Sequence, residues 1–88
     1  MTVTGTLSST TETFTTFDYP TNFTYDNCVC IAFEYLNASD SWRQGEKGVN
    51  DTTYRLFIAL YRSYIGIYNS TSDMAGRAYR VTLMRTDI

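Results

Sequence analysis

Residues 37–51 form a polar segment that contains the side chains best suited to bind a ligand. Trp42, the only tryptophan, stands next to Arg43 and Gln44, and Asp40 precedes it by two positions. A sugar ring can stack on an indole, while planar guanidinium and amide groups bond to its hydroxyls. In the alternative interpretation, Trp42 folds back and closes one end of the domain. These four residues are the candidate ligand-binding residues of this segment, and both interpretations of Trp42 stay open.

A second polar segment, residues 69–76, adds Asn69 and Asp73 to the candidate ligand-binding residues. Both residue types also favour turns for backbone reasons, which is the alternative explanation. Four asparagines fit the N-glycosylation sequon, although about one match is expected by chance: Asn22, Asn37, Asn50 and Asn69. The excess keeps open a glycosylated extracellular domain.

Catalysis has little support in this sequence. The chain has no histidine, so the usual triads and metal sites cannot be built. Its nine acidic residues are scattered, mostly through predicted loops, and show no EF-hand spacing. We expect no enzyme, cofactor or metal, and a small hydrolase is the least favoured alternative.

Charge and hydropathy restrict the partners further. The net charge is -2 and no stretch is basic, which argues against nucleic acid. No apolar run approaches the roughly 18–20 residues that a membrane helix needs, so we expect no membrane insertion. Residues 1–16 are polar and do not resemble a signal peptide.

The small size of the chain points to self-association. A domain of 88 residues buries only about 60–65% of its unfolded surface, so its core is marginal without support. Cys28 and Cys30 would lie ~6.6 Å apart on a strand, at the outer limit for a disulfide. We therefore expect buried thiols and an association interface, with these candidate residues: Cys28, Cys30, Ala32, Tyr61 and Tyr64.

The composition favours strands, with fifteen Thr, eight Tyr and five Phe against one Pro. The clearest strand is Cys28–Leu36. Its alternation places one set of side chains on one face (Val29, Ile31, Phe33, Tyr35) and another on the second (Cys28, Cys30, Ala32, Leu36). Because both faces are largely apolar, we predict a central strand that is covered on both sides. Residues 37–51 are predicted as a long loop.

The other expected strands are short. Residues 2–16 form two strands or one broken strand, and residues 54–61 and 64–68 form a hairpin that turns at Arg62-Ser63, with a helix over residues 54–64 as the competitor. Residues 77–85 form the last strand, with Tyr79, Val81 and Leu83 inward. We predict a single all-β domain over residues 1–88, a small antiparallel β-sandwich of jelly-roll type. Residues 1–16 alternatively connect it to a longer chain.

Two blocks resemble segments of a known group of proteins. They are Phe17-Asp-Tyr-Pro-Thr-Asn-Phe-Thr-Tyr-Asp-Asn-Cys-Val-Cys-Ile-Ala-Phe and Tyr79-Arg-Val-Thr-Leu-Met-Arg. They are similar to stretches near the C-termini of tail, baseplate and fibre proteins of phages that infect Gram-positive bacteria. The middle of the chain, with Trp42, matches nothing in that group.

The resemblance implies a homotrimeric tip or head domain of the virion, which contacts a host-surface saccharide or a neighbouring virion protein. It transfers no catalytic residue. The alternatives are a purely structural virion assembly module and a glycosylated extracellular β-domain.

Overall fold

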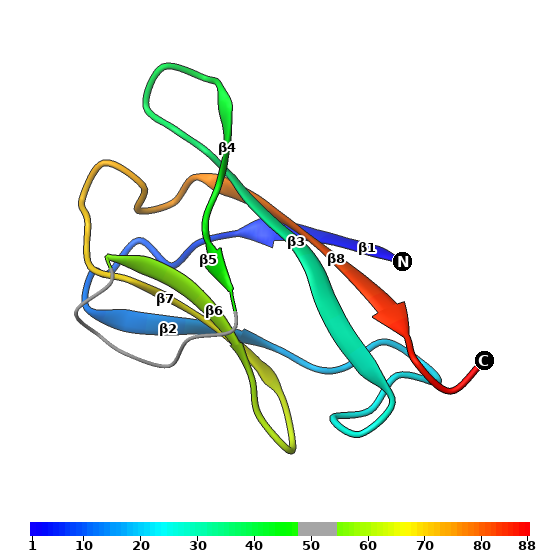
Figure 1. Ribbon diagram of the computed structural model, residues 1–88. Coiled ribbons are helices and arrows are strands. Elements are labelled where there is room, and N and C mark those ends of the chain that lie inside the picture. Colours follow the sequence, from blue (N-terminus) through cyan, green and yellow to red (C-terminus); the bar gives the residue numbers. More distant parts are fainter. Residues whose placement is uncertain (48–54) are drawn as a thin grey trace.

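The computed structural model describes residues 1–47 and 55–88, which form two four-stranded sheets (Figure 1). Sheet A has the strand order β1-β8-β3-β4, and sheet B has the order β2-β7-β6-β5. The strands are β1 (Thr2–Thr6), β2 (Thr13–Phe17), β3 (Cys28–Leu36), β4 (Trp42–Gln44), β5 (Glu46–Lys47), β6 (Leu56–Leu60), β7 (Ile65–Asn69) and β8 (Ala78–Arg85). The predicted all-β class is confirmed. The described part of the chain has no helix that is long and apolar enough to cross a membrane.

The two sheets form a β-sandwich in which the two ends of the chain pair with each other. β1 lies beside β8, and β2 lies beside β7, both antiparallel, as in the rolled-up hairpin of a jelly roll. β3 and β4 form a hairpin inside sheet A, and β5 runs parallel to β6. The predicted small β-sandwich is therefore confirmed, with β1 in sheet A and β2 in sheet B. Sheet B is mixed and not purely antiparallel as predicted, because β5 and β6 are parallel.

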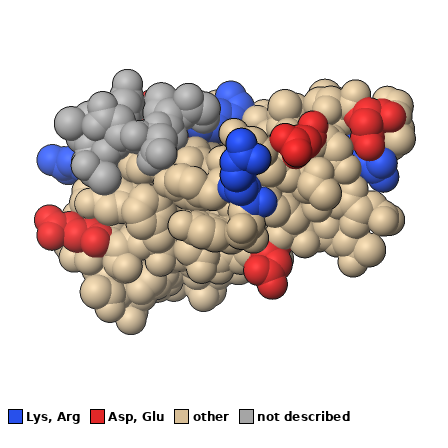
Figure 2. Space-filling view, turned by 90° about the horizontal axis from the view of Figure 1, so that it is seen from below, with Lys and Arg blue, Asp and Glu red and all other residues tan. Residues whose placement is uncertain are grey.

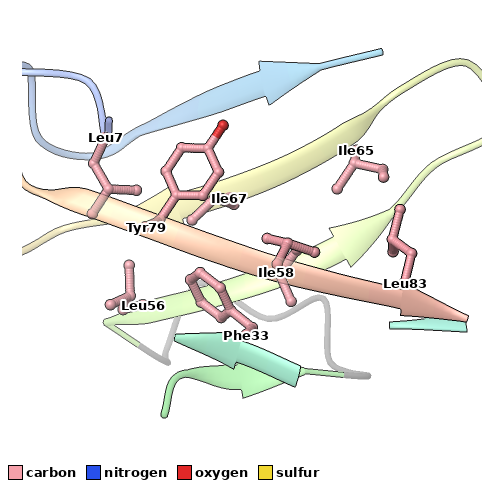
Figure 3. Close-up of a cluster of buried hydrophobic side chains, with 9 residues drawn as sticks. Leu7, Phe33, Leu56, Ile58, Ile65, Ile67, Tyr79 and Leu83 are labelled. Atoms are coloured by element: carbon pink, nitrogen blue, oxygen red, sulfur yellow. The ribbon is translucent and has the colours of Figure 1, made fainter. Parts of the chain in front are cut away.

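Nine buried side chains fill the space between the sheets (Figure 3). Sheet A and the β1–β2 connection contribute Leu7, Phe33, Tyr79, Val81 and Leu83, and sheet B contributes Leu56, Ile58, Ile65 and Ile67. The predicted inward face of the last strand is confirmed, because Tyr79, Val81 and Leu83 are all buried. This layer is the main source of stability, at about 25 cal/mol for each Å² of apolar surface removed from water.

Strand β3 is central, as predicted, but the predicted division of its side chains between two faces is wrong. A β-bulge between Cys30 and Ala32 adds one residue, so the side-chain alternation changes side there. Cys28 before the bulge and Phe33 after it are both buried. Val29 and Ile31 are 42% and 48% exposed, so the described residues cover this part of the strand on one face only.

The predicted hairpin is confirmed as β6 and β7, and the competing helix is wrong over its described residues. The Tyr61 N–H donates a hydrogen bond of 2.9 Å to the Tyr64 carbonyl and closes the turn. Tyr54 lies outside the described residues. The β-branched and aromatic side chains pack on both faces of this pair, which a helix of the same sequence would not achieve.

The predicted long loop over residues 37–51 is wrong in its described part, because it contains β4 and β5. The Asn37 side chain organises a tight turn, in which its Oδ1 accepts hydrogen bonds from the N–H groups of Ser39 and Ser41. This turn reverses the chain at once, so that residues 42–44 pair with residues 34–36 of β3. A turn held by the Asn37 side chain therefore stands where the sequence predicted an irregular loop.

Candidate functional site

The site begins with an arginine that holds the β3–β4 turn in place. The Arg77 guanidinium donates to the carbonyl oxygens of Leu36 and Asn37 and forms an ion pair with Asp40. Asp40 has a positive φ of 60°, as expected for the tight end of such a turn. Because β8 begins beside Arg77, this contact fixes the turn to the last strand of sheet A.

The turn delivers Trp42 to the outer face of sheet A. The Arg80 guanidinium carbon lies 4.0 Å from the centre of the indole ring, which is cation–π distance. Arg80 is itself held by Glu34 through two hydrogen bonds of 2.8 and 3.2 Å. Trp42 remains 38% exposed. The three side chains form a row, which we call the Trp42–Arg80–Glu34 row, across β4, β8 and β3.

Electrostatics reinforce this row. The hydrogen bonds from Arg80 hold the pKa of the Glu34 carboxyl below its ordinary value and raise the pKa of Arg80. Both groups therefore stay charged at neutral pH. Within residues 1–47 and 55–88, the other N–H groups of Arg80 have no protein acceptor, so they are available to an external ligand.

The structure brings together part of the predicted ligand-binding set. Gln44 pairs with Glu34, and Trp42 pairs with Leu36, so both side chains share the outer face of sheet A. Arg43, between them, lies on the opposite side of the strand, and it is exposed. Asp40 lies at the turn that precedes them. Sequence reasoning missed Arg80 and Glu34 as site residues, because only the pairing of β3 with β8 places them beside Trp42.

The second predicted segment contributes differently. Asn69 is only 2% exposed, and its side chain bonds to both the N–H and the carbonyl of Thr71. The Asn69 amide therefore organises its own loop, and Asn69 is not part of the candidate site. Asp73 is exposed in the same loop, four residues before Arg77.

The candidate interface residues lie in three different places. Cys28 and Cys30 are free thiols that face the space between the sheets, and burial raises the pKa of both. Ala32 is half-buried on the outer face of sheet A. Tyr61 and Tyr64 pack against each other at the β6–β7 turn, with ring centroids 5.1 Å apart and ring planes tilted by 35°.

A second aromatic surface was not predicted as a group. On the outer face of sheet B, the Phe14 ring contacts Phe57, Tyr61 and Tyr68, with centroids 5.2–6.1 Å apart. Gly66 lies directly beneath these rings and leaves room for them, since a Cβ atom built on it would come 3.0 Å from the Tyr61 ring. The alternation of β6 and β7 places Phe57 and Tyr68 on one face, but Phe14 comes from β2, which lies far away in sequence.

Three of the four sequons lie in described residues. Asn22 is exposed, Asn37 is half-buried with its side chain inside the turn, and Asn69 is buried. Asn50 lies outside the described residues. Among the described side chains, no three His, Cys, Asp or Glu residues gather as a metal site would require. On the face drawn in Figure 2, basic and acidic side chains are interspersed and neither sign gathers into a patch.

Comparisons with known proteins give no relative from which a function could be transferred. No protein-family model, no curated protein and no solved structure matches this chain.

Proposed function

We propose that this chain is a non-catalytic recognition domain of a phage tail or fibre tip, which acts as a homotrimer and binds a host-surface glycan. The single observation that carries the proposal is the stacked arrangement of Trp42 and Arg80, 4.0 Å apart on the outer face of sheet A. The resemblance of the two sequence blocks to phage tip proteins supports the virion as the location of this chain.

The Trp42–Arg80–Glu34 row suits a sugar for two reasons. First, the indole is held in one orientation by Arg80, which Glu34 holds in turn, so little side-chain freedom is lost on binding. Second, hydrogen-bonding groups share the outer face with the exposed ring. They are the Arg80 N–H groups that have no acceptor among the described residues and the exposed amide of Gln44. Flat apolar surface beside planar donors is the chemistry by which aromatic side chains hold saccharides.

A purely structural assembly module is the second candidate. Val29, Ile31 and Met84 are 42%, 48% and 50% exposed, and Val29 pairs directly with Met84 on the outer face of sheet A. Apolar side chains gathered on one flat sheet face are typical of a protein interface. Burial of this face against a neighbouring subunit would also supply the stability that a small core lacks.

Binding to purified cell-wall polysaccharide from Gram-positive bacteria tests the first function. Trp42→Ala is expected to weaken binding at least tenfold, whereas Tyr25→Ala, which removes another exposed aromatic ring, is expected to leave it unchanged. Binding that survives Trp42→Ala would remove the row from the site.

Size-exclusion chromatography with light scattering tests assembly. We expect a trimer that Met84→Lys converts to a monomer, with Arg62→Lys, on an exposed turn, as the control. A stable wild-type monomer would contradict both candidates. A Met84-dependent trimer that binds no polysaccharide would favour the structural module.

A further inference from the structure

One edge of the sandwich is covered over only half of its length by the described strands. β4 pairs with residues 34–36 of β3, and the Gly45 N–H donates to the Phe33 carbonyl at 2.8 Å. The chain then leaves sheet A, and β5 pairs with Phe57 and Ile58 of β6. Beyond this crossing, the first residues of β3 and the last residues of β6 face one another across a cleft. No described strand pairs with Cys28 or Cys30 on this side.

A cleft of about 780 Å³ opens at this half of the edge. Its walls are the ends of two strands from different sheets: Cys28, Val29 and Cys30 of β3, and Ile58, Ala59 and Leu60 of β6. Its floor is apolar, since Cys28 and Ile58 are buried and Cys30 and Leu60 pack against the core. Asp26 and Arg62, which also line the cleft, are of opposite charge, so the cleft selects neither sign.

The direction of the backbone groups shows what this cleft offers. The Asn27 carbonyl accepts a hydrogen bond of 2.8 Å from the Thr86 N–H, so the backbone of Asn27 faces β8. Because backbone groups alternate along a strand, those of Cys28 and Cys30 face the cleft. The same alternation applies on the other wall. The Tyr61 N–H donates to the carbonyl of Tyr64, the residue before β7, so the backbone of Leu60 faces away from β7.

We propose that this cleft binds an extended segment of a separate protein chain by strand addition to β3. Exposed N–H and C=O groups at strand spacing are matched by the backbone of another strand. The occupant would place apolar side chains at positions i and i+2 on the floor, beside the small Cys28 and Cys30 thiols. Its intervening side chain would lie next to Val29 and Ile31, which are exposed on the outer face.

A single strand fits this cleft better than a second copy of the domain. The crossing at Gly45 closes one end, and both sheets flank the opening, so a folded copy would have to bring two sheets to a site that has room for one strand. The proposal does not depend on glycan binding, because the Trp42–Arg80–Glu34 row lies beyond the crossing, at the other end of β3.

The chain offers a convenient test. The hydrogen bond between Thr86 and Asn27 places the C-terminus beside the start of β3, so a strand fused after Ile88 reaches the cleft through a short flexible linker. One fusion carries Thr-Val-Thr-Val-Thr after a linker of about ten Gly and Ser residues. The matched control carries Thr-Pro-Thr-Pro-Thr, which lacks the N–H groups that a strand pair needs.

Amide hydrogen exchange, measured residue by residue by NMR, shows whether the fused strand pairs with β3. We expect exchange at Cys28 or Cys30 to slow at least tenfold in the Val fusion relative to the Pro fusion. The Val29 amide, which faces β8, is expected to change little and serves as the internal control. Equal exchange in the two fusions would overturn the proposal. Protection of Cys28 and Cys30 that grows with the concentration of the unfused protein would also overturn it, because a second copy would then be the occupant.

Discussion

Gly45 lies so close to Phe33 that a Cβ atom built on the glycine would come within 2.4 Å of the Phe33 ring. This contact is where the chain leaves sheet A for sheet B. Phe33 is buried in the centre of the core and cannot move aside. The absence of a side chain at position 45 therefore lets the crossing strand lie directly over the core.

Gly45→Ala is expected to lower the free energy of unfolding by about 1–3 kcal/mol, the usual cost of overpacking a core. Urea unfolding followed by circular dichroism measures this. Gly76→Asn is the control, because position 76 has open space around it and asparagine tolerates its φ of 73°. A Gly45→Ala protein as stable as the wild type would contradict the close contact.

Arg77→Ala is expected to lower the free energy of unfolding by about 2 kcal/mol, because the carbonyls of Leu36 and Asn37 lose a charged donor. Arg85→Ala is the control. Its partner Asp87 lies two residues along the same chain end, and solvent screens exposed pairs of this kind, so they contribute little to stability. If both variants lose the same stability in urea unfolding, Arg77 does not hold the β3–β4 turn.

Acid is expected to release Trp42 from its stacked position. The pKa of Glu34 is lowered by its hydrogen bond to Arg80, so the contribution of the pair is complete above the ordinary value of 4.5. It is lost as the pH falls through the lower pKa of the folded protein. Fluorescence of Trp42, the only tryptophan, should stay constant down to about pH 4.5 and change below it.

Glu34→Gln should show this changed fluorescence spectrum already at neutral pH. Glu12→Gln removes a carboxylate from an exposed loop and should behave like the wild type. A Glu34→Gln protein with the wild-type spectrum would show that the orientation of the Trp42 indole does not depend on the Glu34–Arg80 ion pair.

Alkali is expected to act through Tyr19. Burial, followed by the nearby Cys28, Tyr25 and Asp26, raises the pKa of Tyr19 to about 12 from 10.0, and its O–H donates to the Tyr61 carbonyl at 2.6 Å. A raised pKa means that the contribution is complete below pH 10 and is lost as the pH rises towards 12.

Tyr19→Phe should therefore cost about 1 kcal/mol at neutral pH and remove part of the alkaline loss of stability. Thermal unfolding across this pH range compares it with Tyr64→Phe, at an exposed ring that is not among the causes of the Tyr19 shift. Identical alkaline curves for wild type and Tyr19→Phe would assign the loss to other groups.

The two thiols are expected to react slowly with a disulfide reagent at neutral pH, since burial raises the pKa of both Cys28 and Cys30. Unfolding in urea should increase the rate at least tenfold. Cys30→Ser, which keeps the more buried Cys28, should leave the slower of two kinetic phases. Fast reaction of both thiols in the native protein would contradict their inward orientation.

Several elements of this fold follow from local sequence alone. Alternation and strand-forming composition predict β3, the β6–β7 hairpin and the inward face of β8 correctly, because each depends on the side chains of one continuous segment. The absence of a bridge between Cys28 and Cys30 follows from backbone geometry over two residues. These are short-range properties, and short-range rules are sufficient for them.

Other features were decided by pairing between distant segments. The bulge at Ile31 has no local signal. It arises where β3 must match the register of β8, and it moves Phe33 into the core. In the same way, the strand Trp42–Gln44 looks like loop in isolation, because its order comes from the Asn37 turn and from β3.

The candidate site likewise combines features that the local sequence shows with features that only the pairing of distant segments creates. Sequence alone singles out Trp42, Gln44 and Asp40 as candidates for ligand binding, because hydrogen-bonding and stacking capacity belong to the side chain itself. Only the tertiary structure placed Arg80, 38 positions later, against the Trp42 indole, buried Asn69 and opened the cleft beside Cys30. The physical reason is that burial and contact are properties of the packed sheets, and strand order, which sets them, is a long-range outcome of folding.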